Sequence, residues 1–151
     1  GGYMTGRLIA ALAMIAVSIG LLGLLAAFGG VAMPAWRWAA PLGLGLASAI
    51  PFALIGLNIG LRLGSQGAVA LANLIFLSFC LFGGLWFPLS IMPTWMSKVA
   101  EFTPSYHLGQ LSQMLSGMQP MADVPRHLSV LGAISGAALA GAWAAWRRQA
   151  A

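Results

Sequence analysis

The sequence predicts an all-α polytopic membrane protein with four transmembrane helices and a short pair of re-entrant or interfacial helices between the third and the fourth. Hydrophobic residues make up 60% of the 151 residues and charged residues only 6%, whereas a soluble domain carries about 25% charged residues. Long uncharged apolar stretches recur along the chain, and about 20 such residues in a helix match the thickness of a hydrocarbon core. Two shorter apolar stripes lie between the last two long stretches and cannot cross a bilayer.

The four expected spans belong to a single membrane domain that covers residues 1–151, and the sequence lacks a starting Met, so we expect a part of a longer protein. The spans are separated by basic residues and by glycine or proline turns. They cover residues 8–28, 39–61, 67–87 and 128–146.

The stretch from residue 81 to 111 interrupts this pattern. We expect the third span to break at Pro88 and two amphipathic helices to follow, over residues 93–102 and 104–117. Thr103 is the predicted N-cap of the second helix, with Pro104 at its first position. Because irregular backbone at membrane depth must be covered by protein, we expect other spans to cover this hairpin. The predicted apolar faces consist of Trp95, Met96, Val99 and Phe102 in the first helix, and of Leu108, Leu111, Leu115 and Met118 around the second.

Glycines spaced four residues apart form two candidate helix-packing faces. Such ladders let another helix backbone come close within a membrane, although a chain with 20 glycines can also produce one by chance. The candidate packing residues are Gly56, Gly60 and Gly64 in and after the second span, and Gly132 and Gly136 in the fourth.

Four further polar residues each allow two interpretations. Asn58 and Asn73 lie in or near spans, where an amide either forms a structural hydrogen bond between helices or contacts a substrate. We favour the structural bond. The adjacent Tyr106 and His107 fit an interfacial pair, with the histidine facing water or bonding a carbonyl, and we favour this over a direct functional role.

Few residues are available for catalysis. Glu101 and Asp123 are the only acidic residues, and His107 and His127 are separated by twenty positions, so the sequence has neither an HExxH motif nor a close pair of metal ligands, and we expect no enzyme and no metal site. The sequence has no GxxxxGK[ST] loop for a nucleotide and no basic patch for nucleic acid. A membrane transporter is the favoured class. An ion- or proton-coupled carrier or channel is an alternative, although it requires charged groups inside the spans, and an intramembrane enzyme is a weaker one.

The segment LFGGLWFPLSIMPTWMSKVAEFTPSYHLGQL resembles the C-terminal signature of ABC-2-type transporter permeases, the membrane subunits of type-2 ABC exporters. In that family a glycine- and proline-rich break ends the fifth span, a short helix pair follows, and a last span ends in basic residues. His107 adjoins the matching positions and completes the candidate exit-gate hairpin. The matching positions are Gly83, Gly84, Pro88, Pro93, Trp95, Pro104 and Tyr106.

The resemblance implies a permease with six spans, of which the first two and the coupling helix between spans two and three are not in this chain. It implies a dimer with a second permease copy or paralogue, docked to ABC ATPase subunits that bind ATP and Mg. The permease itself then binds no cofactor. The expected function is export of a drug-like or lipid-like hydrophobic molecule across the cell membrane. Both ends of this chain would be cytoplasmic, in agreement with the weak excess of basic residues on that side.

Overall fold

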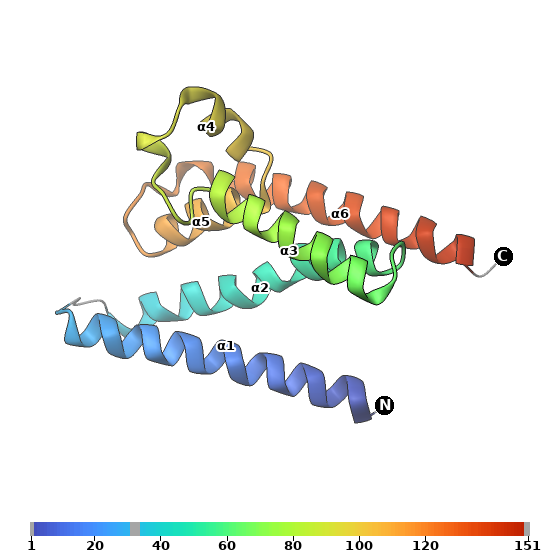
Figure 1. Ribbon diagram of the computed structural model, residues 1–151. Coiled ribbons are helices and arrows are strands. Elements are labelled where there is room, and N and C mark those ends of the chain that lie inside the picture. The colour runs from blue at the N-terminus through green and yellow to red at the C-terminus, as the bar shows by residue number, and fades with distance from the viewer. Residues whose placement is uncertain (1, 31–33, 150–151) are drawn as a thin grey trace.

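The computed structural model describes residues 2–30 and 34–149, and every regular element in these residues is a helix (Figure 1). The all-α prediction is therefore confirmed for this part of the chain. The long helices are α1 (Gly2–Phe28), α2 (Ala35–Gly60), α3 (Ser65–Phe82) and α6 (Val124–Gln149). Between α3 and α6 lie four short elements: η1 (Leu89–Ile91), α4 (Thr94–Ala100), α5 (Pro104–Leu115) and η2 (Met121–Asp123).

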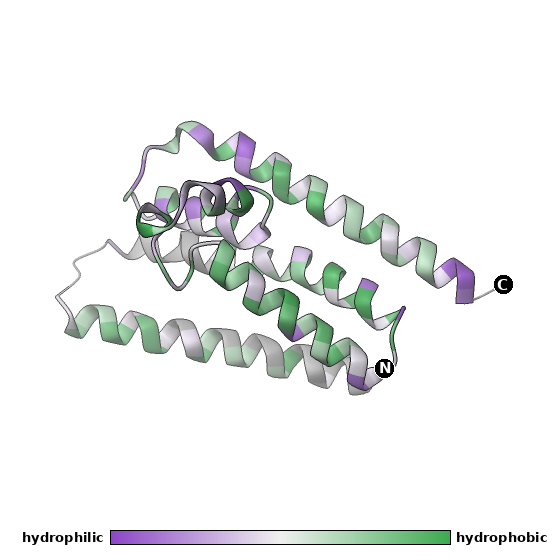
Figure 2. Cartoon of the chain, turned by 45° about the horizontal axis from the view of Figure 1, so that its top comes forward, coloured by the Kyte–Doolittle hydropathy of each residue, from purple (hydrophilic) through white to green (hydrophobic). Residues whose placement is uncertain are grey.

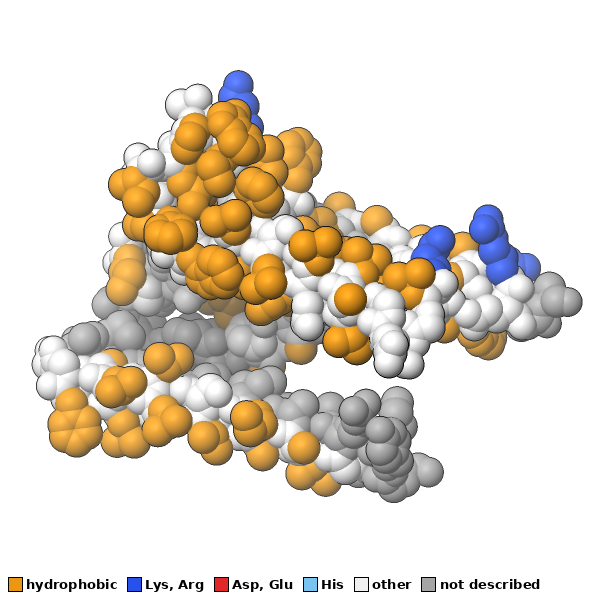
Figure 3. All heavy atoms as spheres, in the orientation of Figure 1, with side chains coloured by type: hydrophobic (Ala, Val, Ile, Leu, Met, Phe, Trp, Pro, Cys, Tyr) orange, Lys and Arg blue, Asp and Glu red, His pale blue; other side chains and the backbone are white. Residues whose placement is uncertain are grey.

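Three helical stretches are long and apolar enough to cross a membrane: Gly43–Gly60 in α2, Ser65–Phe82 in α3, and Met121–Gln149, which includes α6. Only 11%, 6% and 17% of these three stretches, respectively, is buried inside the chain. Apolar side chains therefore cover their outer faces, as Figures 2 and 3 show. Such bare apolar helices are stable only where lipid or another protein covers them.

The expected first span lies in α1, whose described apolar stretch, Ala16–Phe28, is shorter than a full crossing. Several side chains nearer the start of α1, including Arg7, lie outside the described residues, as do those of Trp36, Arg37 and Trp38. Four membrane crossings therefore remain a prediction. The start of α1 and the end of α6 lie toward the same end of the molecule (Figure 1).

The centre of the fold is formed by α2, α5 and α6, which contact one another, while α3 contacts α2, α4 and α5. The short helices α4 and α5 lie beyond one end of α3, at the end where α6 begins (Figure 1). The buried face of α6 is made of Ala138, Ala142 and Ala145. Alanines at this spacing share one helix face and let α2 come close.

Candidate functional site

The break after α3 is built by two adjacent glycines, and it comes earlier than predicted. The helix ends at Phe82, with Gly83 as C-cap and Gly84 at a φ of 75°. The N–H groups of Leu85 and Gly84 bond to the carbonyls of Cys80 at 3.0 Å and Leu81 at 3.3 Å. This is a Schellman motif, which requires a left-handed residue that glycine adopts most easily. The prediction that the helix reaches residue 87 and breaks at Pro88 is therefore wrong.

Gly83 also lies where the start of α5 comes close to the end of α3. A Cβ atom at this position would overlap the Ser105 side chain and the Phe79 carbonyl. The Ser105 hydroxyl donates a hydrogen bond to the Phe79 carbonyl oxygen, across 26 positions of sequence. Because Gly83 has no side chain, Ser105 can bond to the last turn of α3 and hold the two helices together. No local sequence pattern indicates this role of Ser105.

The start of α5 follows the predicted capping pattern. Thr103 is the N-cap and Pro104 the first helical residue. The Thr103 hydroxyl accepts from the Tyr106 N–H at 3.4 Å and donates to the Ala100 carbonyl at 2.7 Å. Thr103, Pro104 and Ser105 are all buried. The cap therefore joins the end of α4 to the first turn of α5 inside the protein.

The buried face of α5 differs from the predicted apolar stripe. It consists of Pro104, Ser105, His107, Leu111 and Met114, so Leu111 is the one predicted residue on it. The α5 helix ends at Leu115, two residues before the predicted end, and Met118 is 75% exposed beyond it. The predicted apolar face was wrong because Ser105 and His107 are buried through their hydrogen bonds, which side-chain hydropathy does not indicate.

His107 and His127, which are twenty positions apart in the sequence, form a buried pair. Their Nδ1 atoms are 2.7 Å apart, and the two residues are only 1% and 4% exposed. The expectation that His107 faces water is wrong, but its Nε2 does bond a backbone carbonyl, that of Glu101, at 2.7 Å. No spacing rule finds this pair, because α5 and α6 meet through tertiary packing.

The carbonyl of Glu101 fixes the tautomer of His107. A carbonyl oxygen only accepts, so the Nε2 of His107 must carry a hydrogen. In neutral His107 the Nδ1 is then an acceptor, and the Nδ1–H of His127 donates to it. A single added proton still leaves one hydrogen between the two Nδ1 atoms. A second one places two N–H groups face to face and removes the hydrogen bond.

Arg126 and Glu101 form an ion pair beside the two histidines, with 2.8 Å between the Arg126 guanidinium and Glu101 Oε2. The side chains are 57% and 47% exposed, respectively, so this pair contributes about 0–1 kcal/mol. We call the four residues Glu101, His107, Arg126 and His127 the hairpin joint. It connects the α4–α5 hairpin to the beginning of α6.

A second contact, which we call the mid-helix joint, holds α2 against the middle of α6 through Asn58, Arg62, Ala138 and Gly141. The Asn58 amide donates to the Ala138 carbonyl at 3.2 Å and accepts from Arg62 Nε at 2.7 Å. Arg62 also donates to the Gly141 carbonyl at 3.2 Å. Asn58 thus makes the interhelical bond that the sequence favoured for it. Asn73 is exposed and lines a cavity of about 210 Å³ between α2 and α3.

Between α2 and α6, the glycine that allows close helix packing is Gly141. A Cβ atom there would overlap the Asn58 amide. By contrast, nothing lies within 4 Å of a Cβ built on any glycine of the two predicted packing faces. Those faces do not pack inside the described chain, and contact with a helix outside it remains a prediction. The open positions are Gly56, Gly60, Gly64, Gly132 and Gly136.

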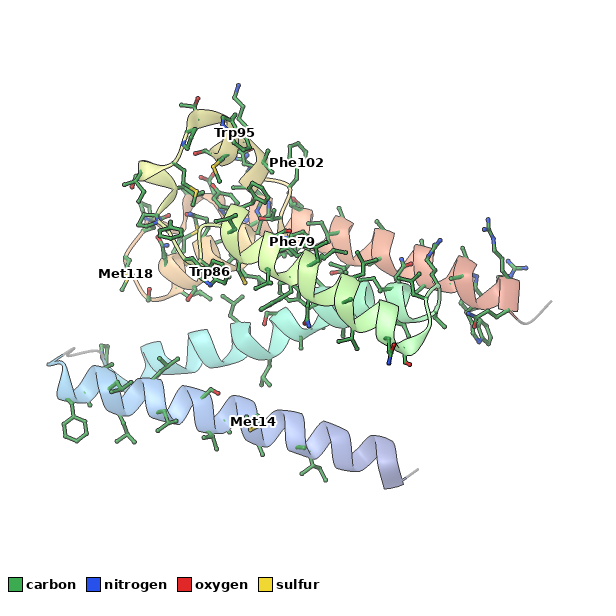
Figure 4. All side chains as sticks on the ribbon, viewed as in Figure 1. Met14, Phe79, Trp86, Trp95, Phe102 and Met118 are labelled. Carbon is green, nitrogen blue, oxygen red and sulfur yellow. The ribbon has the colours of Figure 1, made fainter. Side chains whose placement is uncertain are left out.

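The remaining hairpin residues lie near the surface. Pro88 and Pro93 are exposed N-caps of η1 and α4, so Pro93 precedes the helix and does not occupy its first turn. Trp95 is 58% exposed, with its ring centroid 6.4 Å from that of Phe82. Phe102 is 81% exposed near Trp95 (Figure 4). This apolar face is not covered within the chain, which suits a segment at a membrane surface.

Tyr106 is half-buried, and its ring centroid lies 5.2 Å from His107 and 6.0 Å from His127. The predicted hairpin residues therefore divide into two groups. Gly83, Gly84, Pro104, Tyr106 and His107 lie at or near the contacts of α5, while Pro88, Pro93 and Trp95 lie on the outer side. Within residues 2–30 and 34–149, no three metal-ligating side chains of the His, Cys, Asp or Glu type lie together.

Comparison with known proteins relates part of this chain to a transport protein. Over 64 residues it is 36% identical to the protein named "Putative transport permease YvfS" of Bacillus subtilis strain 168. The match covers 42% of this chain and 26% of that protein, so this chain matches about a quarter of the relative's length. No family model and no solved structure matches the chain. The apolar helices and this partial likeness together support membrane transport.

Proposed function

We propose that this chain is the C-terminal membrane portion of an ABC-2-type permease, the transport subunit of an ATP-driven exporter. The observation that carries the proposal is the hairpin of α4 and α5, inserted between two apolar helices of spanning length, in a chain related in part to a named transport permease. Both ends of the chain are cytoplasmic in this proposal, and the protein resides in the cell membrane.

The cavity between α2 and α3 favours a hydrophobic cargo. It is lined mainly by apolar side chains, including Phe52, Phe76 and Phe79. Phe52 and Phe76 meet edge to face, with centroids 6.1 Å apart. Phe82 lies outside this cavity and packs against Trp95, and Met14 lies on α1 (Figure 4). A site of this composition favours a drug-like or lipid-like molecule over an ion.

The proposal requires partners. The sequence contains no phosphate-binding loop, so ATP and Mg would bind to a separate ATPase subunit. A second permease copy or paralogue would cover part of the exposed apolar helices. The glycine faces with open space, Gly56–Gly60–Gly64 and Gly132–Gly136, are available for such a contact.

The histidine pair gives the alternative, a proton-coupled carrier, one specific argument. Buried titratable residues in membrane proteins often lie on proton paths, and His107 and His127 share a hydrogen bond out of contact with water. The pair lies at the hairpin end of α6, whereas a coupled carrier needs titratable groups along its spans. No charged residue occurs between Arg62 and Lys98 in the sequence. We therefore favour the exporter.

Transport by the full-length protein tests the two proposals against each other. A fluorescent hydrophobic dye would be added outside inverted membrane vesicles, and its uptake would be measured with and without the ATPase encoded nearest to this gene. The exporter predicts uptake that requires ATP and the ATPase and survives a protonophore. Uptake that the protonophore abolishes and ATP does not drive would favour the carrier. Equal uptake in vesicles from the deletion strain would contradict both.

A further inference from the structure

A polar cavity of about 300 Å³ lies between the glycine loop after α3, one face of α5 and the turn that follows α5. Its polar side chains are all uncharged: Ser90, Tyr106, Gln110, Gln113 and Gln119. The rest of its lining consists of glycine, proline and leucine. A cavity without charge is a poor site for an ion, because the ion would lose water without gaining an opposite charge.

The glutamines make this cavity suited to a neutral group with many hydrogen-bonding atoms. Gln119 Nε2 donates to Gln113 Oε1 at 2.6 Å, which leaves the Gln113 amide hydrogens and a lone pair on the Gln119 oxygen for a ligand. Each amide offers both donors and acceptors, and the Tyr106 hydroxyl offers one of each kind. Hydroxyl-rich head groups such as sugars need this mixture.

An apolar cavity of about 440 Å³ adjoins the polar one, between α2, α3 and α5. Leu44, Phe52, Phe76 and Leu108 contribute its apolar surface. The two cavities share three lining residues, Leu85, Gly109 and Gln113. At their boundary the Leu85 side chain lies against Gly109, where a Cβ would be 3.8 Å from Leu85 Cδ2. A single molecule with a polar and an apolar part can occupy both cavities by lying along this shared lining.

We propose that the two cavities together bind an amphiphile with an uncharged, hydroxyl-rich head group. The head group lies among Tyr106, Gln110 and Gln113, and the hydrocarbon part lies against Phe52 and Phe76. This names the cargo class of the exporter and, in that respect, rests on the function proposed above. Binding itself does not depend on ATP, so the two proposals can fail separately.

Thiol protection measures the binding. In a background where Cys80 and every other native cysteine of the full-length protein are replaced by Ala, Ser90→Cys places one thiol in the polar cavity. Ser65→Cys in the same background places one at the exposed start of α3 as a control. The full-length protein in phosphatidylcholine nanodiscs would be labelled with a maleimide. Dodecyl maltoside, dodecyl sulfate and dodecyltrimethylammonium, which share one chain length, would be titrated below their micelle concentrations.

We expect dodecyl maltoside to slow labelling at Ser90→Cys but not at Ser65→Cys. The concentration that halves the labelling rate at Ser90→Cys should be at least about tenfold lower for dodecyl maltoside than for either charged amphiphile. Replacing both Gln110 and Gln113 by Leu should raise the protective concentration about tenfold, since hydrogen bonds to the head group are lost. Gln66→Leu, an exposed change outside the cavities, is the matched control. An unchanged circular dichroism spectrum and unfolding transition of each variant would show that the fold is kept.

Equal protection by all three head groups, or an unchanged maltoside response in the Gln110/Gln113 variant, would overturn the proposal. Selective maltoside protection without ATP-driven transport in vesicles would support the binding site and overturn the exporter. ATP-driven transport without selective protection would support the exporter and overturn the binding site. Free maltose should protect much less than dodecyl maltoside, because it leaves the apolar cavity empty.

Discussion

The two joints along α6 hold neighbouring helices by different chemistry. At the hairpin joint, two buried histidines bond to each other through their side chains and fix α5 to the start of α6. At the mid-helix joint, Asn58 and Arg62 of α2 bond to backbone carbonyls of α6. The histidine contact of the hairpin joint depends on protonation and is hidden from water. The mid-helix joint uses an amide, which does not titrate, and a guanidinium.

This difference matters for a membrane protein. If α2 and α6 slide slightly, an amide that loses one helix carbonyl can bond to another, because each turn of α6 offers further carbonyls. Two imidazole rings bond only in one arrangement and only in certain protonation states. We therefore interpret the mid-helix joint as the permanent contact and the hairpin joint as the one that can open.

The largest expected effect is at the hairpin joint, in His107→Ala. This change removes the partner of His127 Nδ1 and of the Glu101 carbonyl and leaves space in a buried site. Buried unpaired polar groups cost about 1–3 kcal/mol each, so we expect unfolding in detergent to become easier by about 2–4 kcal/mol. Maleimide labelling of the buried Cys80 would report whether α5 separates from α3. A loss below half a kcal/mol would show that the pair is not a structural contact.

The mid-helix joint is tested by Gly141→Leu. A side chain at Gly141 meets the Asn58 amide, and overpacking of this kind costs about 1–3 kcal/mol. Gly60→Leu is the matched control within α2, since a Cβ there meets nothing within 4 Å. Unfolding in detergent should separate the two variants. If Gly60→Leu is the more damaging change, the Gly56–Gly60–Gly64 face packs against a second chain, as the sequence predicted.

Particular residues show how much of the fold can be predicted from the sequence. The sequence predicted the helices, the N-cap at Thr103 followed by Pro104, and a structural hydrogen bond for Asn58, because helix periodicity, capping and membrane burial are local physical effects. It missed the His107–His127 pair and the Gly141 contact, because which helix faces meet depends on tertiary packing. It placed the break at Pro88 because proline is the stronger helix breaker, whereas Gly84 ends the helix first by adopting a positive φ.

Acidification should weaken the hairpin joint and spare the mid-helix joint. In the unfolded chain His127 takes up a proton near the ordinary histidine pKa of about 6.5. In the folded chain burial, and then the neighbouring His107 and Arg126, lower the pKa of His127. In the folded chain the second proton removes the Nδ1–Nδ1 bond and places two positive rings together, beside Arg126 and with Asp123 and Glu101 nearby. The folded state then holds fewer protons than the unfolded state, so stability falls as the pH is lowered.

We expect the free energy of unfolding to fall between pH 7.5 and 5, measured by unfolding in a detergent that does not titrate. His127→Gln keeps a hydrogen-bonding side chain but does not titrate, so most of this pH dependence should disappear in it. Hydrogen exchange of α5 amides, corrected for intrinsic rates, should rise at pH 5 while that of α2 near Asn58 stays constant. An equal rise in both regions would remove the distinction between the joints.

The smallest expected effect is that of Asn58→Leu at the mid-helix joint. The change removes the bond to Ala138 and the acceptor of Arg62, yet interhelical bonds in membranes average only about 0.6 kcal/mol. Asn73→Leu, an exposed change on α3, is the control and should have no effect in detergent. If Asn58→Leu costs more than His107→Ala, the mid-helix joint holds the larger share of the stability. A reduction in transport by Asn73→Leu without a change in stability would instead indicate that Asn73, at the cavity between α2 and α3, contacts the cargo.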